Sequence, residues 1–528
     1  MDLHTARHRQ GVVCAPHHAA VAAGRDVLAE GGNALEAMVA MAATIAVVFP
    51  HMNGIGGDGF WLVRERSGKI RALMAAGAAG ALARPELYRG HDTIPALGPL
   101  AALTVPAALA GWMLALEASR PLGGRLPLAE LLGSATRHAR EGFVPSKSLA
   151  GCTAGSTAEL KAVPGFAQAF LVDGKPPPQG ATFKQTALAA TLDHLAHAGL
   201  DDFYRGDIGR EIAADLDRVG SPVTRADLER CRATVAEPLS VELEAGTVYN
   251  TPLPTYGLVS LLILALFDRL KVKEGEGFDH VHGLVEATKR ALAVRDIYVT
   301  DPARQPKSPE RYLSDIFLDA QAAGIDRRKA SARKSLQDAG DTVWMGAADG
   351  SGLVVSYIQS LYWEFGSGVV LPKTGILMQN RGTSFTLRGG LNRLEPGRLP
   401  PHTLNPALAV LRDGRIMAYG TMGGDAQPQI QAALFTRHVR YGTPLDVALD
   451  RPRWLYGRTW GSSHGSLMVE ARFDGNLIDR LLEAGHEVVE LPAPYAESMG
   501  HAGAVVLHPD GTLEGGHDPR ADGGAAGV

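Results

Sequence analysis

Paired apolar runs, separated by short turns rich in Asp and Gly, predict β-hairpins in the last third of the chain. This feature constrains the fold most, because Asp-Gly turns flanked by strand-like residues are the strongest local hairpin signal. The hairpins are expected at 342–358 with a turn at 349–352, at 408–420 with a turn at 413–414, and from 504 with a turn near 510–511. Hairpins pair antiparallel, which argues against a regular repeat of parallel strands and helices.

Helical patterns dominate the earlier part of the chain. Residues 18–48 predict two alanine-rich helices interrupted at Gly31-Gly32, with Asn33 and Glu36 placed to form a capping box for the second. Further segments are expected as follows: a tight glycine-rich turn at 54–59, a strand at 60–63, helices at 105–118 and 284–298, an exposed and mobile charged connector at 301–341, and a glycine-rich low-complexity tail at 514–527. Helices first and hairpins later predict an α+β fold.

Composition excludes several classes of function. With 528 residues, 45% of them hydrophobic, the chain can bury a large core, and its net charge of −4 gives no reason to expect nucleic acid or an anionic membrane as a partner. The longest uncharged apolar stretches, 37–49 and 258–267, fall short of the ~20 residues that span a bilayer. The first residues lack the apolar core of a secretory signal, and three scattered cysteines suit a reducing compartment, so we expect a cytoplasmic protein.

Several short motifs resemble functional sites but lack the required context. Gly54-x-Gly56-x-x-Gly59 has dinucleotide-loop spacing, yet a helix precedes it and a strand follows, which reverses the order that phosphate binding needs. Ser463 lies in a G-x-S-x-G pattern, but a strand follows where a nucleophile elbow needs a helix. The pairs His280-x-His282 and His194-x-x-His197 have no third ligand at a recognisable spacing, so we expect no metal.

The pair Asp341-Thr342 is a candidate for self-activating chemistry. Thr342 lies where the connector ends and the first hairpin begins. A threonine freed by cleavage carries a hydroxyl nucleophile and, beside it, an α-amine with a pKa of about 7.7–8.0 that can act as the base. Such a reaction also needs two amide donors for the oxyanion, and Gly423-Gly424 after the second hairpin can supply them.

The chain resembles the γ-glutamyltransferase family of N-terminal-nucleophile (Ntn) hydrolases along nearly its whole length. The resemblance rests on GGNALEA (31–37), PHMNGIGGDGF (50–60), GDTVWMGAADGSGLVVSYIQS (340–360), FGSGVV (365–370), TGILMQN (374–380), GTMGGDAQPQ (420–429) and DPRADGGAAG (518–527). It implies a four-layer αββα sandwich without a cofactor. It also implies self-cleavage at Asp341–Thr342 into a large subunit (1–341) and a small subunit (342–528), which stay together as a heterodimer; whether heterodimers pair further is left open.

The same resemblance assigns roles to particular residues. Thr342 would form an acyl-enzyme that water or an amine resolves, Ser360 stands where the family has a second threonine beside the nucleophile, and Gly423 and Gly424 match the oxyanion pair.

The substrate-binding positions depart from the γ-glutamyl pattern. Ala76 stands where the arginine that holds the donor's α-carboxylate is usual, and Ser384 where the aspartate for its α-amino group is usual. The other departures are His402-Thr403 for paired serines, Tyr362 for an asparagine and Arg381 for a Glu or Gln. Each lost charge-assisted hydrogen bond costs about 1.5–3 kcal/mol, so a glutathione-like donor should bind poorly.

This combination resembles the oxamate amidohydrolase branch of the family, which converts oxamate to oxalate and ammonia in purine breakdown. The candidate substrate-binding residues are Tyr362, Arg381, Ser384, His402 and Thr403. The simpler interpretation is that these side chains only pack in the core or, for Arg381, form a structural ion pair. Three alternatives remain open: a γ-glutamyltransferase or glutathione hydrolase, another acylase such as one acting on β-lactam side chains, and an uncleaved binding protein.

Overall fold

The computed structural model describes residues 4–178, 180–332, 341–457 and 466–528, and of Asp341 only the backbone. Two seven-stranded sheets form its centre. The first sheet runs, in spatial order, β1 (Thr5–His8), β16 (Leu513–His517), β15 (Ala502–Leu507), β11 (Ile416–Thr421), β10 (Ala407–Leu411), β7 (Gly246–Asn250) and β6 (Leu239–Leu243). The second runs β17 (Gly524–Gly527), β2 (Gly11–Ala15), β8 (Asp341–Asp349), β9 (Val354–Tyr362), β3 (Asp58–Arg64), β4 (Ile70–Ala75) and β5 (Thr234–Ala236).

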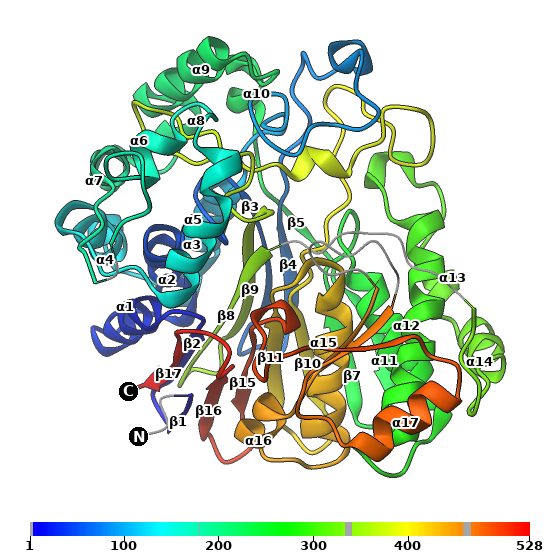
Figure 1. Cartoon of the computed structure of the whole chain (residues 1–528). Coiled ribbons are helices and arrows are strands. Elements are labelled where there is room, and N and C mark those ends of the chain that lie inside the picture. The colour runs from blue at the N-terminus through cyan, green and yellow to red at the C-terminus, as the bar shows by residue number, and fades with distance from the viewer. Residues whose placement is uncertain (1–3, 179, 333–340, 458–465) are drawn as a thin grey trace.

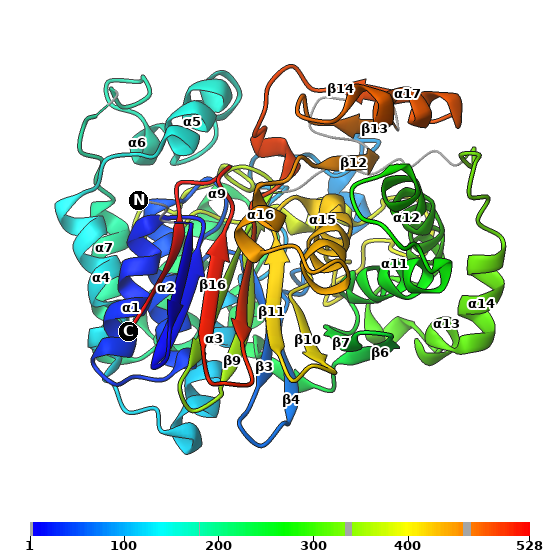
Figure 2. The same ribbon diagram turned by 90° about the horizontal axis from the view of Figure 1, so that it is seen from below.

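Helices cover the outer face of each sheet, as the two views in Figures 1 and 2 show. Over the second sheet lie α1 (His18–Ala29), α2 (Ala34–Val48), α3 (Ala108–Ser119), α4 (Leu128–Glu141) and α7 (Thr186–Ala198). Over the first sheet lie α11 (Gly257–Leu270), α12 (Phe278–Tyr298) and α15 (Gln427–Phe435). The architecture is therefore the four-layer αββα sandwich expected from the sequence.

Three apolar clusters hold these layers together. One lies between the sheets and includes Phe60, Trp344 and Val505, all fully buried, while the other two lie between each sheet and its helices. Burial of apolar surface on both faces of each sheet is what makes a sandwich of this kind stable.

Peripheral elements complete the chain. They are α5 (Lys147–Leu160), α6 (Phe166–Phe170), α8 (Asp202–Arg205), α9 (Asp207–Val219), α10 (Arg225–Arg230), α13 (Glu310–Leu313), α14 (Asp315–Ala323), α16 (Leu445–Asp450), α17 (Gly475–Glu483) and the small sheet β12 (Trp454–Gly457), β13 (Ser466–Val469) and β14 (Val488–Glu490). Two short 3₁₀ turns, η4 (Arg381–Ser384) and η5 (Gly424–Ala426), lie near the candidate site.

The three hairpins and the helix pair are confirmed. The capping box is present, since Asn33 accepts from the N–H groups of Leu35 and Glu36 while the Glu36 carboxylate accepts from the Asn33 N–H. The glycine-rich stretch 54–59 is the close-packed turn expected, because a Cβ on Gly56 would lie 2.0 Å from the Leu377 carbonyl oxygen.

The glycine-rich tail forms β16 and β17, one strand in each sheet. One expectation, the exposed connector at 301–341, was wrong. The connector is not uniformly exposed, because it contains α14 with the fully buried Leu318, while the end of its charged run, 333–340, lies outside the described residues.

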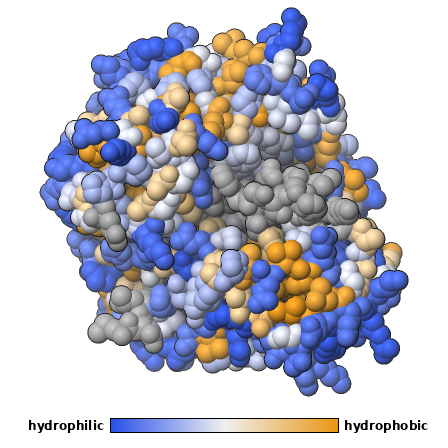
Figure 3. Space-filling model, viewed as in Figure 1, coloured by the Kyte–Doolittle hydropathy of each residue, from blue (hydrophilic) through white to orange (hydrophobic). Residues whose placement is uncertain are grey.

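Residues on both sides of Asp341 build both sheets. The first sheet takes β1, β7 and β6 from before this position and β16, β15, β11 and β10 from after it, and the second sheet is mixed in the same way. On the face shown in Figure 3, hydrophilic residues surround smaller apolar patches. None of the described helices is both long and apolar enough to cross a membrane.

Candidate active site

Thr342 lies at the start of β8, a central strand of the second sheet (Figure 1). The pairing with β9 shifts register between Asp341 and Val343, so Thr342 lies at a bulge. Bulges re-aim a side chain out of the regular alternation and are frequent beside active sites. Thr342 is almost fully buried, and its Oγ1 donates to the Ser360 Oγ at 3.2 Å.

Two polar side chains meet the Thr342 hydroxyl. Ser360, at the end of β9, also accepts the Tyr362 N–H at 2.7 Å, which fixes its hydroxyl. The Gln427 Nε2 approaches Thr342 Oγ1 at 3.5 Å, and the Gln427 Oε1 accepts from the Asn405 side-chain amide at 3.2 Å. Ser360 was a candidate from the sequence, whereas Gln427 was missed: only its place in the block 420–429 pointed to it.

Gly423 and Gly424 form the turn between β11 and α15. Both have left-handed backbone, with φ of +119° and +54°, which side chains rarely adopt. They begin the 3₁₀ turn η5, which leads directly into α15, and at the start of a helical segment backbone N–H groups have no intrahelical partner and the helix dipole favours negative charge. Gln427, three residues on, contacts Thr342, so the turn that could stabilise an oxyanion lies beside the candidate nucleophile.

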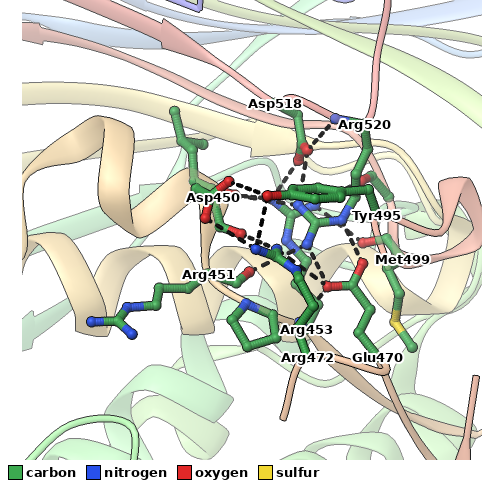
Figure 4. Close-up of polar contacts among 12 residues, drawn as sticks. Asp450, Arg451, Arg453, Glu470, Arg472, Tyr495, Met499, Asp518 and Arg520 are labelled. Atoms are coloured by element: carbon green, nitrogen blue, oxygen red, sulfur yellow. Dashed lines mark hydrogen bonds and ion pairs between the residues drawn. The ribbon is translucent and has the colours of Figure 1, made fainter. Parts of the chain in front are cut away.

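A buried ionic cluster, which includes Arg453, Glu470, Asp518 and Arg520 (Figure 4), contacts this turn through Gly500. Arg453 pairs with Asp518 and donates to the Gly500 carbonyl at 2.6 Å. Gly500 packs tightly on the turn, since a Cβ there would lie 2.9 Å from the Met422 carbonyl oxygen. Burial lowers the pKa of Arg453 to about 10, and the Asp518 carboxylate opposes this shift. The cluster continues through Arg520, which bonds the Asp518 Oδ1 at 3.0 Å and also pairs with Glu470.

Arg381, in η4, is a buried cation without a carboxylate partner. It is 3% exposed, its Cζ lies 3.3 Å from the centroid of the Tyr362 ring, and its Nη1 donates to the Thr403 Oγ1 at 3.3 Å. Among the described side chains, which do not include that of Asp341, no carboxylate lies within 4.0 Å of it. The Asp425 carboxylate is instead paired with Arg295 at 2.7 Å. A guanidinium is rarely buried unless it is paired, so this arrangement suits an incoming anion.

Tyr362 holds a backbone conformation that is unusual for its type. Its φ is +86°, in the left-handed region where glycine and asparagine are enriched and bulky residues are outliers. Such strain costs about 1–3 kcal/mol and tends to occur at functional sites. This conformation places the ring against the Arg381 guanidinium.

The remaining candidates lie around the same arginine with differing contacts. The Ser384 hydroxyl donates to the carbonyls of Arg381 and Pro401, at 2.9 and 3.4 Å, so its proton is already used. His402 is fully buried, with its Nε2 3.1 Å from the Asp58 Oδ2. Burial lowers the pKa of His402, the Asp58 carboxylate opposes this shift, and the positive charge of Arg381 adds to it.

The other motifs have structural contacts. His194 lies 3.2 Å from Asp202, and His280 bonds Thr436 at 2.8 Å. His282 bonds His486 at 2.8 Å; these two and Glu286 come within 4.8 Å of one another, but the carboxylate is paired with Lys289 at 2.7 Å. Ser463 lies outside the described residues.

The αββα sandwich, with a threonine at the start of a central strand and a helix N-terminus beside it, defines the class of N-terminal-nucleophile hydrolases. The family model for gamma-glutamyltranspeptidase matches residues 20–528. The chain therefore belongs to the gamma-glutamyltranspeptidase family, and it is an amidohydrolase of that family, acting on C–N bonds.

Relatives match the chain over its whole length. It is 51% identical over 519 residues to the oxamate amidohydrolase proenzyme of Klebsiella pneumoniae subsp. pneumoniae, covering 98% of each chain. It is 38% identical to the glutathione hydrolase-like YwrD proenzyme of Bacillus subtilis, again over 98% of each. The crystal structure of cephalosporin acylase from Bacillus halodurans is similar with a TM-score of 0.91 and 31% identity, covering 99% of this chain and 97% of that one.

Proposed function

We propose that the chain cleaves itself between Asp341 and Thr342 and then hydrolyses a small amide that carries a carboxylate, with oxamate as the substrate. The buried guanidinium of Arg381, which forms no ion pair with the described side chains, is the observation that carries this proposal, since the substrate's carboxylate could serve as its counter-ion. The 51% identity to an oxamate amidohydrolase proenzyme supports the same substrate. A cytoplasmic location and a role in purine breakdown stay predictions.

Cleavage would leave two pieces that hold each other in place. Pieces 1–341 and 342–528 each contribute strands to both sheets, so their separation would expose the apolar core between the sheets. We therefore expect a stable heterodimer of the two cleavage products.

The proposed reaction uses the new α-amine of Thr342 as the base. The amine takes the Oγ1 proton as the oxygen attacks the amide carbon of oxamate, and Ser360 holds the hydroxyl in place. The N–H groups of Gly423 and Gly424 would stabilise the oxyanion. Collapse breaks the C–N bond as the protonated amine returns its proton to the leaving nitrogen, which departs as ammonia and leaves an oxalyl ester on Thr342. Water, deprotonated by the same amine, then attacks the ester and releases oxalate, and the Thr342 oxygen regains a proton.

Two measurements test the proposal. After incubation at neutral pH, the purified protein should give two masses, the smaller beginning at Thr342, and ammonia should be released from oxamate. Thr342→Ala should stay one chain without turnover; cleavage at the same bond in this variant would refute the nucleophile. Faster turnover of γ-glutamyl-p-nitroanilide than of oxamate would favour the γ-glutamyl alternative instead.

A further inference from the structure

A buried carboxylate lies next to the candidate site but is not part of its chemistry. Asp58, the first residue of β3, is fully buried and pairs across the sheet with Ser360. Its Oδ1 accepts the Gly77 N–H at 2.9 Å, and its Oδ2 lies 3.1 Å from the His402 Nε2. A carboxylate is costly to bury unless polar or cationic groups lie beside it. The Asp58 carboxylate and the groups around it therefore restrict one another's positions.

The segment that Asp58 contacts also contacts Arg381. Thr403, next to His402, accepts the Arg381 Nη1–H, and on the other side of His402 the Pro401 carbonyl accepts the Ser384 hydroxyl. Residues 401–403 thus contact η4 at both ends and Asp58 in the middle. No other hydrogen bond of the Arg381 side chain is found in the part of the chain that the structure describes, so its direction depends on this segment and on the Tyr362 ring.

The same segment is tied to the nucleophile from a second direction. Asn405 donates to the Thr403 carbonyl at 2.7 Å and to Gln427, the residue that approaches Thr342. These hydrogen bonds of Asn405 do not involve Asp58. Loss of the contact between Asp58 and His402 should therefore displace Thr403, the partner of Arg381, more than it displaces Thr342.

We propose that Asp58 is a positioning residue for the anion site, acting through His402 and Thr403 to hold the Arg381 guanidinium where the substrate's carboxylate binds. The inference rests on the proposed function and adds a residue that touches neither the nucleophile nor the guanidinium. Asp58 acts on binding rather than on the chemical step, so KM and kcat should respond differently to its loss.

The test compares oxamate with its neutral analogue oxamide in the processed enzyme. Asp58→Asn keeps the shape and removes the charge, and we expect the KM for oxamate to rise about tenfold, within the range for residues coupled through one network, with kcat changed less than about twofold. The KM for oxamide should stay within about twofold. Asp215→Asn is the matched control, because Asp215 is a buried carboxylate that pairs with Arg218 and accepts the Lys373 N–H.

A double-mutant cycle with Arg381→Gln tests whether Asp58 affects binding through Arg381. If Asp58 acts through Arg381, adding Asp58→Asn to Arg381→Gln should raise KM less than about twofold further, whereas an independent effect would multiply in full. If the two increases in KM multiply in full in the double variant, or if Asp58→Asn alone leaves KM unchanged, the inference is overturned. If Arg381→Gln leaves the oxamate KM unchanged, the anion site of the proposed function is wrong instead.

A second pair of variants keeps the test valid if Asp58→Asn does not fold. His402→Gln retains a donor near the position of the imidazole Nε2, while His402→Leu does not. The glutamine variant should raise the oxamate KM less than the leucine variant does. Equal KM values would show that the contact with Asp58 has no effect on binding and would overturn the inference.

Discussion

Tyr362 should reverse the usual stability order of alanine and glycine. At an ordinary position glycine is less stable than alanine by about 0.4–1 kcal/mol, because its unfolded chain has more freedom. At a φ of +86°, however, a Cβ costs about 1–2 kcal/mol. We therefore expect Tyr362→Gly to have a free energy of unfolding about 1 kcal/mol higher than Tyr362→Ala, although both variants lose the same ring.

The ring itself should matter for binding. With its Cζ 3.3 Å from the ring centroid, Arg381 has little freedom before substrate arrives. Without the ring, binding must immobilise the arginine at a cost of about 0.5–1.5 kcal/mol, which raises the KM for oxamate about 2- to 12-fold. Both Tyr362→Gly and Tyr362→Ala should show this increase, and Tyr362→Phe, which retains a ring, should show little of it.

The two effects need separate assays. Urea midpoints should be compared in a Thr342→Ala background, so that each variant unfolds as one chain, and KM should be measured in the processed enzymes. A glycine variant no more stable than the alanine variant would refute the strain argument. Equal KM values in Tyr362→Phe and Tyr362→Ala would refute the role of the ring.

Three further predictions follow from other parts of the molecule. Gly424→Val places a β-branched residue at a φ of +54°, which should shift the backbone and move the Gly424 N–H away from the oxyanion, so kcat should fall about 10²–10³-fold while circular dichroism stays native; an unchanged kcat would exclude this donor. Arg453→Met leaves Asp518 without its partner and should lower the free energy of unfolding by about 3–5 kcal/mol, measured by denaturant titration, and a loss below about 1 kcal/mol would contradict it. Burial lowers the pKa of five buried histidines to about 3 or 4: His17, His280, His486, His501 and His517. They stay neutral in the folded protein but take up protons on unfolding below pH 6.5, so each should lower the free energy of unfolding by about 1.4 kcal/mol per pH unit between pH 6.5 and about 4. A thermal midpoint that does not change over that pH range would contradict the burial of these histidines.

Local signals in the sequence predicted the elements whose causes are local. The capping box at Asn33 and the Asp-Gly turns act within a few residues, so the helix pair and the hairpins could be read directly. The pairing of β17 with β2 could not, because it depends on contacts with distant backbone: a Cβ on Gly523 would lie 1.9 Å from the Ala15 carbonyl oxygen. Glycine in a strand can mark such close approach, but the sequence does not name the neighbour.

The candidate site likewise contains residues that the sequence predicted and residues that it did not. Thr342 and the glycine pair could be proposed from the patterns around them, and the resemblance supplied Ser360. Asp58 and Gln427 lie in blocks that carry the resemblance, but their contacts could not be predicted, because one is 344 residues from His402 and the other is 85 residues from Thr342. Their side chains are ordinary in composition, and only the pairing of β3 with β9 and the turn after β11 bring them to the site.

The arrangement around Arg381 explains how one fold can change substrates while keeping its chemistry. The nucleophile, Ser360 and the glycine turn belong to the two central sheets and the start of α15, whereas the anion-binding side chains come from η4 and the segment 401–403, outside both sheets. Substitutions in these loops leave the strand pairing of both sheets intact, although His402 also packs edge-on against Phe60 of the apolar cluster between the sheets, with 4.8 Å between the ring centroids. A γ-glutamyl donor needs a cation and an anion to hold its zwitterion, but Ala76 and Ser384 stand where the resemblance places the arginine and the aspartate that bind it. The selectivity for oxamate over oxamide should therefore depend on Arg381 in KM, and the selectivity against γ-glutamyl amides should survive replacement of Arg381, because that replacement restores neither of the two missing side chains.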